Sequence, residues 1–295
     1  MATTKNRSTT EDDITAEALR RVAGTPDPRL REIMGALVRH LHGFVKEVNL
    51  TEAEWFQGIQ FLTATGQKCT DIRQEFILLS DTLGVSMVVD LIANRKPAGA
   101  TESTVFGPFH RDNPPPMPSG GNIASRDKGS PAIISGRVLS LDGKPIANAA
   151  LDVWQADSEG LYDSQYADPS KLHMRGLFHS DKDGKYVVRT SLPVAYTIPT
   201  DGPVGAMLNA TGRHPWRPAH THFMVSADGY EPVTTHIFES TDKYLASDAV
   251  FGVKDSLICD FKRHDTADEK AKGLGVAAPF YTADFDFVLN TAGKP

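Results

Sequence analysis

Two histidines in a short run of β-type residues are the clearest candidates for chemistry in this sequence of 295 residues. His220 and His222 lie in Ala219–Ser226, a run whose composition predicts a strand. Because successive side chains of a strand point to opposite faces, both imidazoles are expected on one face, about 7 Å apart along the chain. Such a pair supplies half of a metal site. The alternative is that the two histidines simply line a polar face of a sheet.

The partners that would complete a metal site are scarce near this strand. No cysteine is close in sequence, no His-Glu-x-x-His pattern occurs, and the nearby carboxylates are Asp228, Glu231 and Glu239. Two tyrosines stand in suggestive places, Tyr162 shortly after a predicted strand and Tyr196 at the start of a long loop. A phenol keeps its proton until about pH 10, but a strongly Lewis-acidic trivalent ion can take the proton's place. Two phenolates and two imidazoles would suit ferric iron, whereas tyrosines of β domains are more often half-buried packing residues.

Short strands separated by turn dipeptides are expected to position these residues. Asp-Gly pairs and clusters of proline and glycine punctuate the chain after about residue 101, which is typical of an antiparallel sandwich or barrel. The stretch Thr197–Arg217 is rich in proline and glycine without a clear period, and we expect a loop that carries function. The predicted strands are Ala132–Leu141, Ala149–Trp154, Gly184–Thr190, Ala219–Ser226 and the alternating positions Phe285, Phe287 and Leu289.

Four amphipathic helices are predicted in the first hundred residues. Asp27 can cap the first, with Pro28 at its first position, and Thr51 with Glu54 forms a capping-box pattern for the second. Their apolar faces are richer than four helices could bury alone, so we expect them to pack on the rest of the chain and on a second copy. The apolar positions run through Leu30–Val48, Trp55–Leu62, Thr70–Leu79 and Met87–Leu91.

The composition excludes several classes of protein. Lysine and arginine number 31 against 37 acidic residues, a net charge of −6 that argues against a nucleic-acid partner. No apolar run reaches the roughly 18 residues of a membrane span, and the polar start Met1–Asp13 lacks a secretory signal. Cys69 and Cys259 are too few for a disulfide framework or a thiolate metal site. We therefore expect a cytoplasmic protein without membrane insertion.

Five motifs follow one another along the chain: TVFGPFH at 104–110, LDVWQAD at 151–157, GLY at 160–162, YTIP at 196–199 and RPAHTH at 217–222. Together they resemble the intradiol ring-cleaving dioxygenases of the catechol 1,2-dioxygenase type. A further pair, THIF at 235–238 and SDAVFGVK at 247–254, is most similar to the hydroxyquinol 1,2-dioxygenase subgroup. The resemblance extends from about Thr10 to Leu289. It implies an α+β fold with a helical N-terminal dimerisation domain at 1–100 and an antiparallel β-sandwich catalytic domain at 101–295.

The resemblance implies one Fe(III) per chain, held by four side chains. Tyr162 and His220 would be the pair retained in the plane, and Tyr196 and His222 would be axial. Tyr196 would leave the metal and take a proton from the substrate, which gives it a catalytic role. Arg217 would be the second catalytic residue, stabilising negative charge that develops on the ring carbon.

A pocket for a flat aromatic ring follows from the same resemblance. Asp81 would accept a hydrogen bond from a third ring hydroxyl, although a helix-end role is the alternative. His236 stands where catechol-cleaving members typically have glutamine, and it is either a partner of the oxygen site or a packing residue. The implied substrate-binding residues are Leu79, Asp81, Val105, Phe106, Gly107, Pro108, Phe109, Ile198, Pro199, Arg217, His236 and Val250.

The activity implied by the resemblance is intradiol cleavage of hydroxyquinol (1,2,4-trihydroxybenzene) with O₂ to 3-hydroxy-cis,cis-muconate or its tautomer maleylacetate. A homodimer joined through the helical segment, with a phospholipid in the interface, is also implied. Cleavage of catechol or a chlorocatechol is the alternative within the same class. Two other classes stay open: a non-catalytic, transthyretin-like binding module, and a zinc hydrolase that uses His220, His222 and His236.

Overall fold

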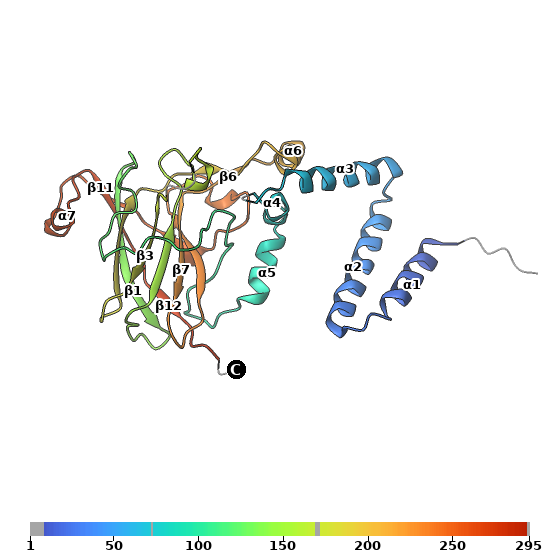
Figure 1. Cartoon of the computed structure of the whole chain (residues 1–295), viewed down its shortest axis with the longest axis horizontal. Helices are drawn as coiled ribbons and strands as arrows, with labels where there is room; N and C mark the ends of the chain where they lie inside the picture. The colour runs from blue at the N-terminus through green and yellow to red at the C-terminus, as the bar shows by residue number, and fades with distance from the viewer. Residues whose placement is uncertain (1–8, 72, 169–171, 294–295) are drawn as a thin grey trace, which may run out of the picture. The chain divides into compact units, whose positions relative to one another are not determined.

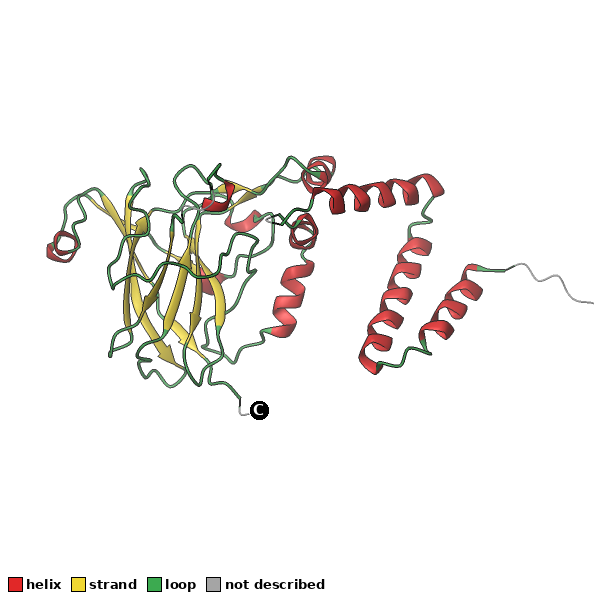
Figure 2. Cartoon of the chain, in the orientation of Figure 1, coloured by secondary structure: helices red, strands yellow, loops and turns green. Residues whose placement is uncertain are grey.

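Helices α1 to α5 precede the first strand in the computed structural model, which describes residues 9–71, 73–168 and 172–293 (Figures 1 and 2). The chain forms two compact units, residues 1–63 and 64–295. The first unit holds α1 (Glu11–Val22), α2 (Pro28–Glu47) and most of α3 (Glu52–Lys68). The two predicted caps are confirmed: Asp27 accepts a hydrogen bond from the backbone of α2 at 2.8 Å, and Thr51 and Glu54 exchange bonds at the start of α3.

Helix α1 was not predicted, because its twelve residues include few large apolar side chains. It begins with a capping box between Thr10 and Asp13, a signal that the sequence does contain. Lys46 of α2 pairs with Asp12 of α1 at 2.8 Å. Ten large apolar side chains of α2 and α3 are 42% to 56% exposed, so this part of each helix is not covered by the described residues. They are Leu30, Ile33, Leu37, Leu41, Phe44, Val45, Trp55, Phe56, Ile59 and Leu62.

Two further helices, α4 (Glu75–Thr82) and α5 (Val85–Ala93), belong to the same compact unit as the sheets, whereas the expected boundary followed them at residue 100. Helix α4 begins five residues after the predicted start at Thr70, because Thr70 and Arg73 pair their backbones in a tight turn. No single helix among the described residues has the length and apolar character to cross a membrane; α4 and α5 together would qualify, with a bend of 79° between them.

Two five-stranded sheets pack face to face and confirm the predicted α+β fold (Figure 2). A two-stranded ribbon, β5 (Tyr196–Thr197) with β6 (Trp216–Arg217), lies outside them. One sheet has the order β3 (Arg175–His179), β2 (Ala150–Trp154), β7 (His220–Ser226), β8 (Val233–Glu239), β9 (Ile258–Cys259). The other has the order β10 (Lys262–His264), β11 (Phe280–Asp284), β1 (Pro131–Ser140), β12 (Phe287–Leu289), with β4 (Lys185–Ser191) also paired to β1.

The β-rich part of the chain differs from the prediction in two respects, one in the sheets and one in a loop. They are not purely antiparallel, since β1 runs parallel to β11 and β12, and β8 runs parallel to β9. Such pairs join strands that are distant in sequence and so leave no hairpin signal. The expected irregular loop Thr197–Arg217 contains helix α6 (Pro203–Ala210), which begins with proline at its first position. The remaining short elements are η1 (Asp163–Gln165), η2 (Leu245–Ser247), η3 (Asp255–Leu257) and α7 (Glu269–Gly273).

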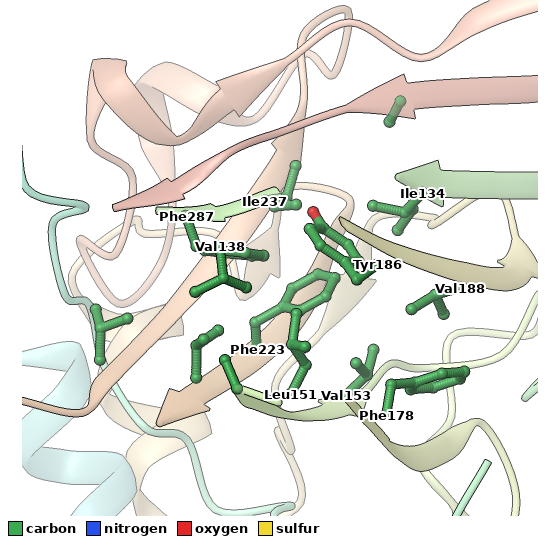
Figure 3. Close-up of a cluster of buried hydrophobic side chains, with 14 of the residues drawn as sticks. Ile134, Val138, Leu151, Val153, Phe178, Tyr186, Val188, Phe223, Ile237 and Phe287 are labelled. Carbon is green, nitrogen blue, oxygen red and sulfur yellow. The ribbon is translucent and has the colours of Figure 1, made fainter. Parts of the chain in front are cut away.

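The hydrophobic core lies between the two sheets (Figure 3). Phe223 of β7 packs near Tyr186 of β4 and Phe287 of β12, with ring centroids 6.2 and 4.9 Å away. All three side chains are at most 1% exposed. The core therefore uses one face of β7 and leaves the other face for the residues that could do chemistry.

Candidate metal centre

The two histidines of β7 lie on the face opposite the core, as their spacing predicts. The Nε2 atoms of His220 and His222 are 3.2 Å apart, and both side chains are at most 2% exposed. His220 donates from Nδ1 to the carbonyl of Pro218 at 2.7 Å, which leaves its Nε2 to face the site. Trp154 of β2 and His236 of β8 stand opposite His222 in the sheet register, and the Trp154 ring stacks on it at 4.6 Å.

Both predicted tyrosines converge on these histidines from other elements. Tyr162, which precedes η1, places its hydroxyl 2.8 Å from Nε2 of His222 and 3.3 Å from the hydroxyl of Tyr196. Tyr196 is positioned by the pairing of β5 with β6, where it stands opposite Arg217. Phe109 stacks on Tyr162 with ring centroids 4.5 Å apart and closes its other side. Four potential ligand atoms, two oxygens and two nitrogens, are therefore connected by a series of short contacts.

These contacts fit a bound metal ion. Ligand atoms about 2.1 Å from a metal, at angles of 90° to 120°, lie about 3.0 to 3.6 Å from one another. Two of the three contacts, at 3.2 and 3.3 Å, fall in this range, and the third is slightly shorter at 2.8 Å. The donor set of phenol oxygens and imidazole nitrogens suits iron. The site thus has the atoms and spacing that an ion needs.

The environment favours neutral imidazoles and disfavours a bare phenolate. Burial, and then the charge of Arg217, lower the pKa of His220 to about 3. Burial lowers the pKa of His222 well below its usual range, with His236 and His220 adding to the effect. Burial also raises the pKa of Tyr162 well above its usual range. A highly charged cation is therefore needed to displace the phenol proton.

A second donor set overlaps the first. His220, His222 and His236 bring potential ligand atoms within 4.8 Å of one another, as the zinc-hydrolase alternative requires. However, the ring of His236 stacks on that of His220 at 4.6 Å, and its Nδ1 lies 3.5 Å from the guanidinium of Arg217. The same guanidinium lies 3.4 Å from the Tyr196 hydroxyl, where a cation favours an ionised phenol, whereas it offers no such gain to a neutral imidazole; the tyrosines are therefore the better ligands for a highly charged ion.

Arg217 lies in the site, as predicted. Its Nη1 is 3.4 Å from the Tyr196 hydroxyl and 3.3 Å from Nε2 of His220, and the side chain is 3% exposed. Burial opposes its charge, but Asp248 and the two tyrosines hold its pKa above the ordinary value. Asp248 pairs with Arg217 at 3.1 Å and was not among the predicted site residues.

Eight of the twelve predicted pocket residues line one or the other of two cavities, of which the first is also lined by a donor residue. The first, of about 580 Å³, is lined by Tyr196, Pro108, Phe109, Ile198 and Pro199. The second, of about 560 Å³, is lined by Asp81, Val105, Phe106 and Gly107. A Cβ atom at Gly107 would lie 3.3 Å from the His222 ring, so this segment passes directly over a potential ligand.

The other predicted pocket residues line neither cavity. Leu79 and Val250 are buried, and Leu78, one position before Leu79, lines the first cavity instead. Arg217 and His236 are buried at the donor atoms. The sequence carries no local signal for Leu78, and it includes Asp248 only within the motif at 247–254, to which no role was assigned.

Comparison with known proteins identifies the family. Residues 118–291 match the family model described as Dioxygenase, and residues 27–101 match that of the catechol dioxygenase N terminus. A 6-chlorohydroxyquinol 1,2-dioxygenase of Cupriavidus pinatubonensis is 51% identical over 280 residues, 95% of this chain and 97% of the relative. A hydroxyquinol 1,2-dioxygenase of a Rhizobium species is 52% identical over 271 residues, 91% of this chain and 92% of the relative.

A solved structure agrees with these relatives. The hydroxyquinol 1,2-dioxygenase of Pseudomonas putida DLL-E4 has a TM-score of 0.90 and 52% identity, covering 96% of this chain and 99% of its own. The chain therefore belongs to the intradiol ring-cleavage dioxygenases, a family of non-haem iron enzymes.

Proposed function

We propose that the chain cleaves hydroxyquinol with O₂ between its two adjacent hydroxylated carbons, giving 3-hydroxy-cis,cis-muconate or its tautomer maleylacetate. The observation that carries this proposal is the group of four buried donor atoms beside a cavity of about 580 Å³. Relatives named for hydroxyquinol and 6-chlorohydroxyquinol, about half identical over most of the chain, support the choice of substrate. Catechol and chlorocatechols are the alternative substrates.

We propose that Tyr162, Tyr196, His220 and His222 hold one Fe(III) ion per chain. When bound, this ion supplies the electronic activation that lets a closed-shell diol react with triplet O₂. The two tyrosines differ in access, which supports different roles. Tyr162 is fully buried under Phe109 and would remain in place, whereas Tyr196 lines the cavity and can accept a proton from a substrate hydroxyl.

The other residues bind and orient the ring. Arg217 directs a permanent cation at the Tyr196 hydroxyl from 3.4 Å, close to where negative charge would develop on the substrate. Pro108, Phe109, Ile198 and Pro199 give the cavity an apolar wall that suits a flat aromatic ring. Further proposed neighbours of the substrate are Val105, Phe106, Gly107, Leu79, Val250 and His236.

The visible spectrum tests the proposed ligands. A phenolate bound to ferric iron absorbs visible light, so the iron-loaded protein is expected to be red to burgundy. Tyr196→Phe should shift or weaken the band, and His222→Ala should lower the iron content at least tenfold. Tyr166→Phe, an exposed tyrosine outside the donor set, is the matched control. A colourless protein that binds zinc stoichiometrically would support the hydrolase alternative instead.

Arg217→Ala tests the proposed charge stabilisation. Removing a buried cation beside the reacting ring is expected to lower kcat by about 100-fold or more while iron stays bound. Arg137→Ala, which removes a guanidinium from an exposed surface pair, should leave kcat unchanged. The measurement is turnover of hydroxyquinol with the iron content of each variant determined in parallel. Wild-type turnover by an iron-replete Arg217→Ala protein would refute the role.

Asp81 is proposed to recognise the third hydroxyl of hydroxyquinol. It is buried, burial raises its pKa above the usual value, and it lines the second cavity with Val105 and Gly107. Its carboxyl group can therefore accept a hydrogen bond where water is scarce. A catechol has no hydroxyl to offer at this position.

Side-by-side turnover of hydroxyquinol, catechol and chlorocatechols tests both the substrate and Asp81. The wild-type chain should favour hydroxyquinol, and Asp81→Ala should lower the kcat/KM ratio of hydroxyquinol to catechol by about tenfold or more. Asp90→Ala removes another carboxylate from the same cavity and should not change the ratio. An equal ratio in wild type and Asp81→Ala would eliminate the proposed recognition.

We further propose that residues 1–100 form a dimerisation domain and residues 101–295 the catalytic domain. The two family models support this division because they match residues 27–101 and 118–291. The exposed apolar faces of α2 and α3 support a second copy of the chain as the partner. A phospholipid acyl chain between the helices is proposed as part of the interface.

Native mass spectrometry of the full chain tests this assembly. A dimer is expected, and Leu37→Glu with Leu41→Glu on the exposed face of α2 should convert it to monomer. Arg29→Glu, at an already polar position of α2, is the control. Organic extraction should release a phospholipid from the dimer. A wild-type chain that is monomeric at micromolar concentration would contradict the proposal.

A cytoplasmic location is also proposed. Cys69 and Cys259 are both free, which is consistent with a reducing compartment.

A further inference from the structure

Asp248 makes an unusually complete set of contacts for a loop carboxylate. It follows η2 and is 6% exposed. Its Oδ1 accepts hydrogen bonds from Nε of Arg217 at 3.1 Å and from the backbone of Val250 at 3.3 Å. Its Oδ2 accepts from Nη2 of Arg217 at 3.3 Å and from the backbone of Gly252 at 2.9 Å. Both oxygens are therefore shared between the guanidinium and the following turn.

The hydrogen bonds from Nε and Nη2 of Arg217 to Asp248 determine the direction of the rest of the guanidinium. The group is planar and rigid, so fixing Nε and Nη2 on a carboxylate also fixes the direction of Nη1. That nitrogen faces the hydroxyl of Tyr196 and Nε2 of His220. A Cβ atom at Gly252 would come within 3.0 Å of Nη2, so the turn closes tightly over the guanidinium.

The ion pair between Asp248 and Arg217 offsets part of the free energy that it costs to bury the charge of Arg217. Burial disfavours both charges, but Arg217 holds the pKa of Asp248 below its usual value, and Asp248 does the converse for Arg217. A buried guanidinium without its carboxylate carries a large desolvation penalty and would seek solvent or another partner. Asp81 is another carboxyl group whose charge interacts with that of Arg217.

We propose that Asp248 is a positioning residue, which acts by holding the guanidinium of Arg217 against the Tyr196 hydroxyl. The inference rests on the proposed function, in which Arg217 stabilises charge on the substrate. The competing role for Asp248 is purely structural: its bonds to Val250 and Gly252 would hold the turn whatever Arg217 does. In the positioning role, the effect of changing Asp248 depends on the presence of Arg217; in the structural role it does not.

A double-mutant cycle with Asp248→Asn and Arg217→Ala separates the two roles in the iron-loaded enzyme. Asp248→Asn is expected to lower kcat for hydroxyquinol about 10- to 100-fold, with a smaller change in KM. In the Arg217→Ala background, Asp248→Asn should not lower kcat any further. Asp255→Asn, an exposed carboxylate seven residues along the chain, is the matched control. An equal loss of kcat in both backgrounds would overturn the proposal.

The visible band gives a reading that does not depend on turnover. Because Nη1 of Arg217 faces the Tyr196 oxygen, Asp248→Asn should shift the absorption maximum of the iron-loaded protein when Arg217 is present, and should leave it unchanged in the Arg217→Ala protein. An equal shift in the Arg217→Ala background would indicate a role for the turn and contradict positioning through Arg217. Asp248→Glu keeps the charge but displaces the guanidinium, so it should shift the band as well.

Melting temperatures of the metal-free proteins test the pair without any activity. Arg217→Ala leaves a buried carboxylate unpaired and should lower the melting temperature by about 5 °C or more. Adding Asp248→Asn removes that charge and should recover part of the loss. A further loss on adding Asp248→Asn would refute the coupling. Absence of diol cleavage by the wild-type chain would instead contradict the proposed function, and the melting temperatures would still decide whether the two residues are coupled.

Discussion

The two-residue alternation of β7 is the constraint on which both the core and the candidate metal centre depend. Phe223 and Val225 face the space between the sheets, and His220 and His222 face the opposite way. A slip of one residue in register would bring imidazoles into the core and expose phenylalanine. Pairing with β2 on one side and β8 on the other fixes the register. Core packing therefore sets the direction of two ligands before any metal binds.

The remaining ligands depend on contacts between distant parts of the chain. Tyr162 and Tyr196 are separated by 34 residues, and Tyr162 and His222 by 60, yet their polar atoms come within 3.3 Å. Alternation and helix caps are local properties, which is why the histidine pair and the Asp27 cap could be predicted from residue types alone. The tyrosines could be suggested as partners of the histidines on chemical grounds, but a packing role was the alternative, and it was the resemblance to a family that decided between the two.

The lining residue Leu78, the partner Asp248 and the parallel strand pairs were not predicted, and all three depend on contacts in three dimensions. Successive residues of a helix are rotated by about 100°, so Leu78 and Leu79 of α4 face different directions, and only Leu78 lines the first cavity. Asp248 lies in a loop 31 residues from its partner Arg217. The parallel pairing of β1 with β11 likewise joins segments without a hairpin between them. Each depends on a precise three-dimensional position that composition and period do not encode.

Charge balance in the buried site links the metal to Asp248. Burial raises the pKa of Tyr162, so its ionisation requires a nearby cation of high charge. Arg217 alone does not bring the pKa of Tyr162 back to its usual range, although its charge acts in that direction. Two phenolates and Asp248, set against Arg217, sum to a formal charge of −2. A trivalent ion would bring this group to +1, and binding a diol that loses two protons, one of them to Tyr196, would bring the total to zero. With a divalent ion the same complex would carry a charge of −1. With both tyrosines ionised as proposed, these charges favour the proposed ferric ion over zinc, and the carboxylate of Asp248 offsets the charge that Arg217 brings into the site.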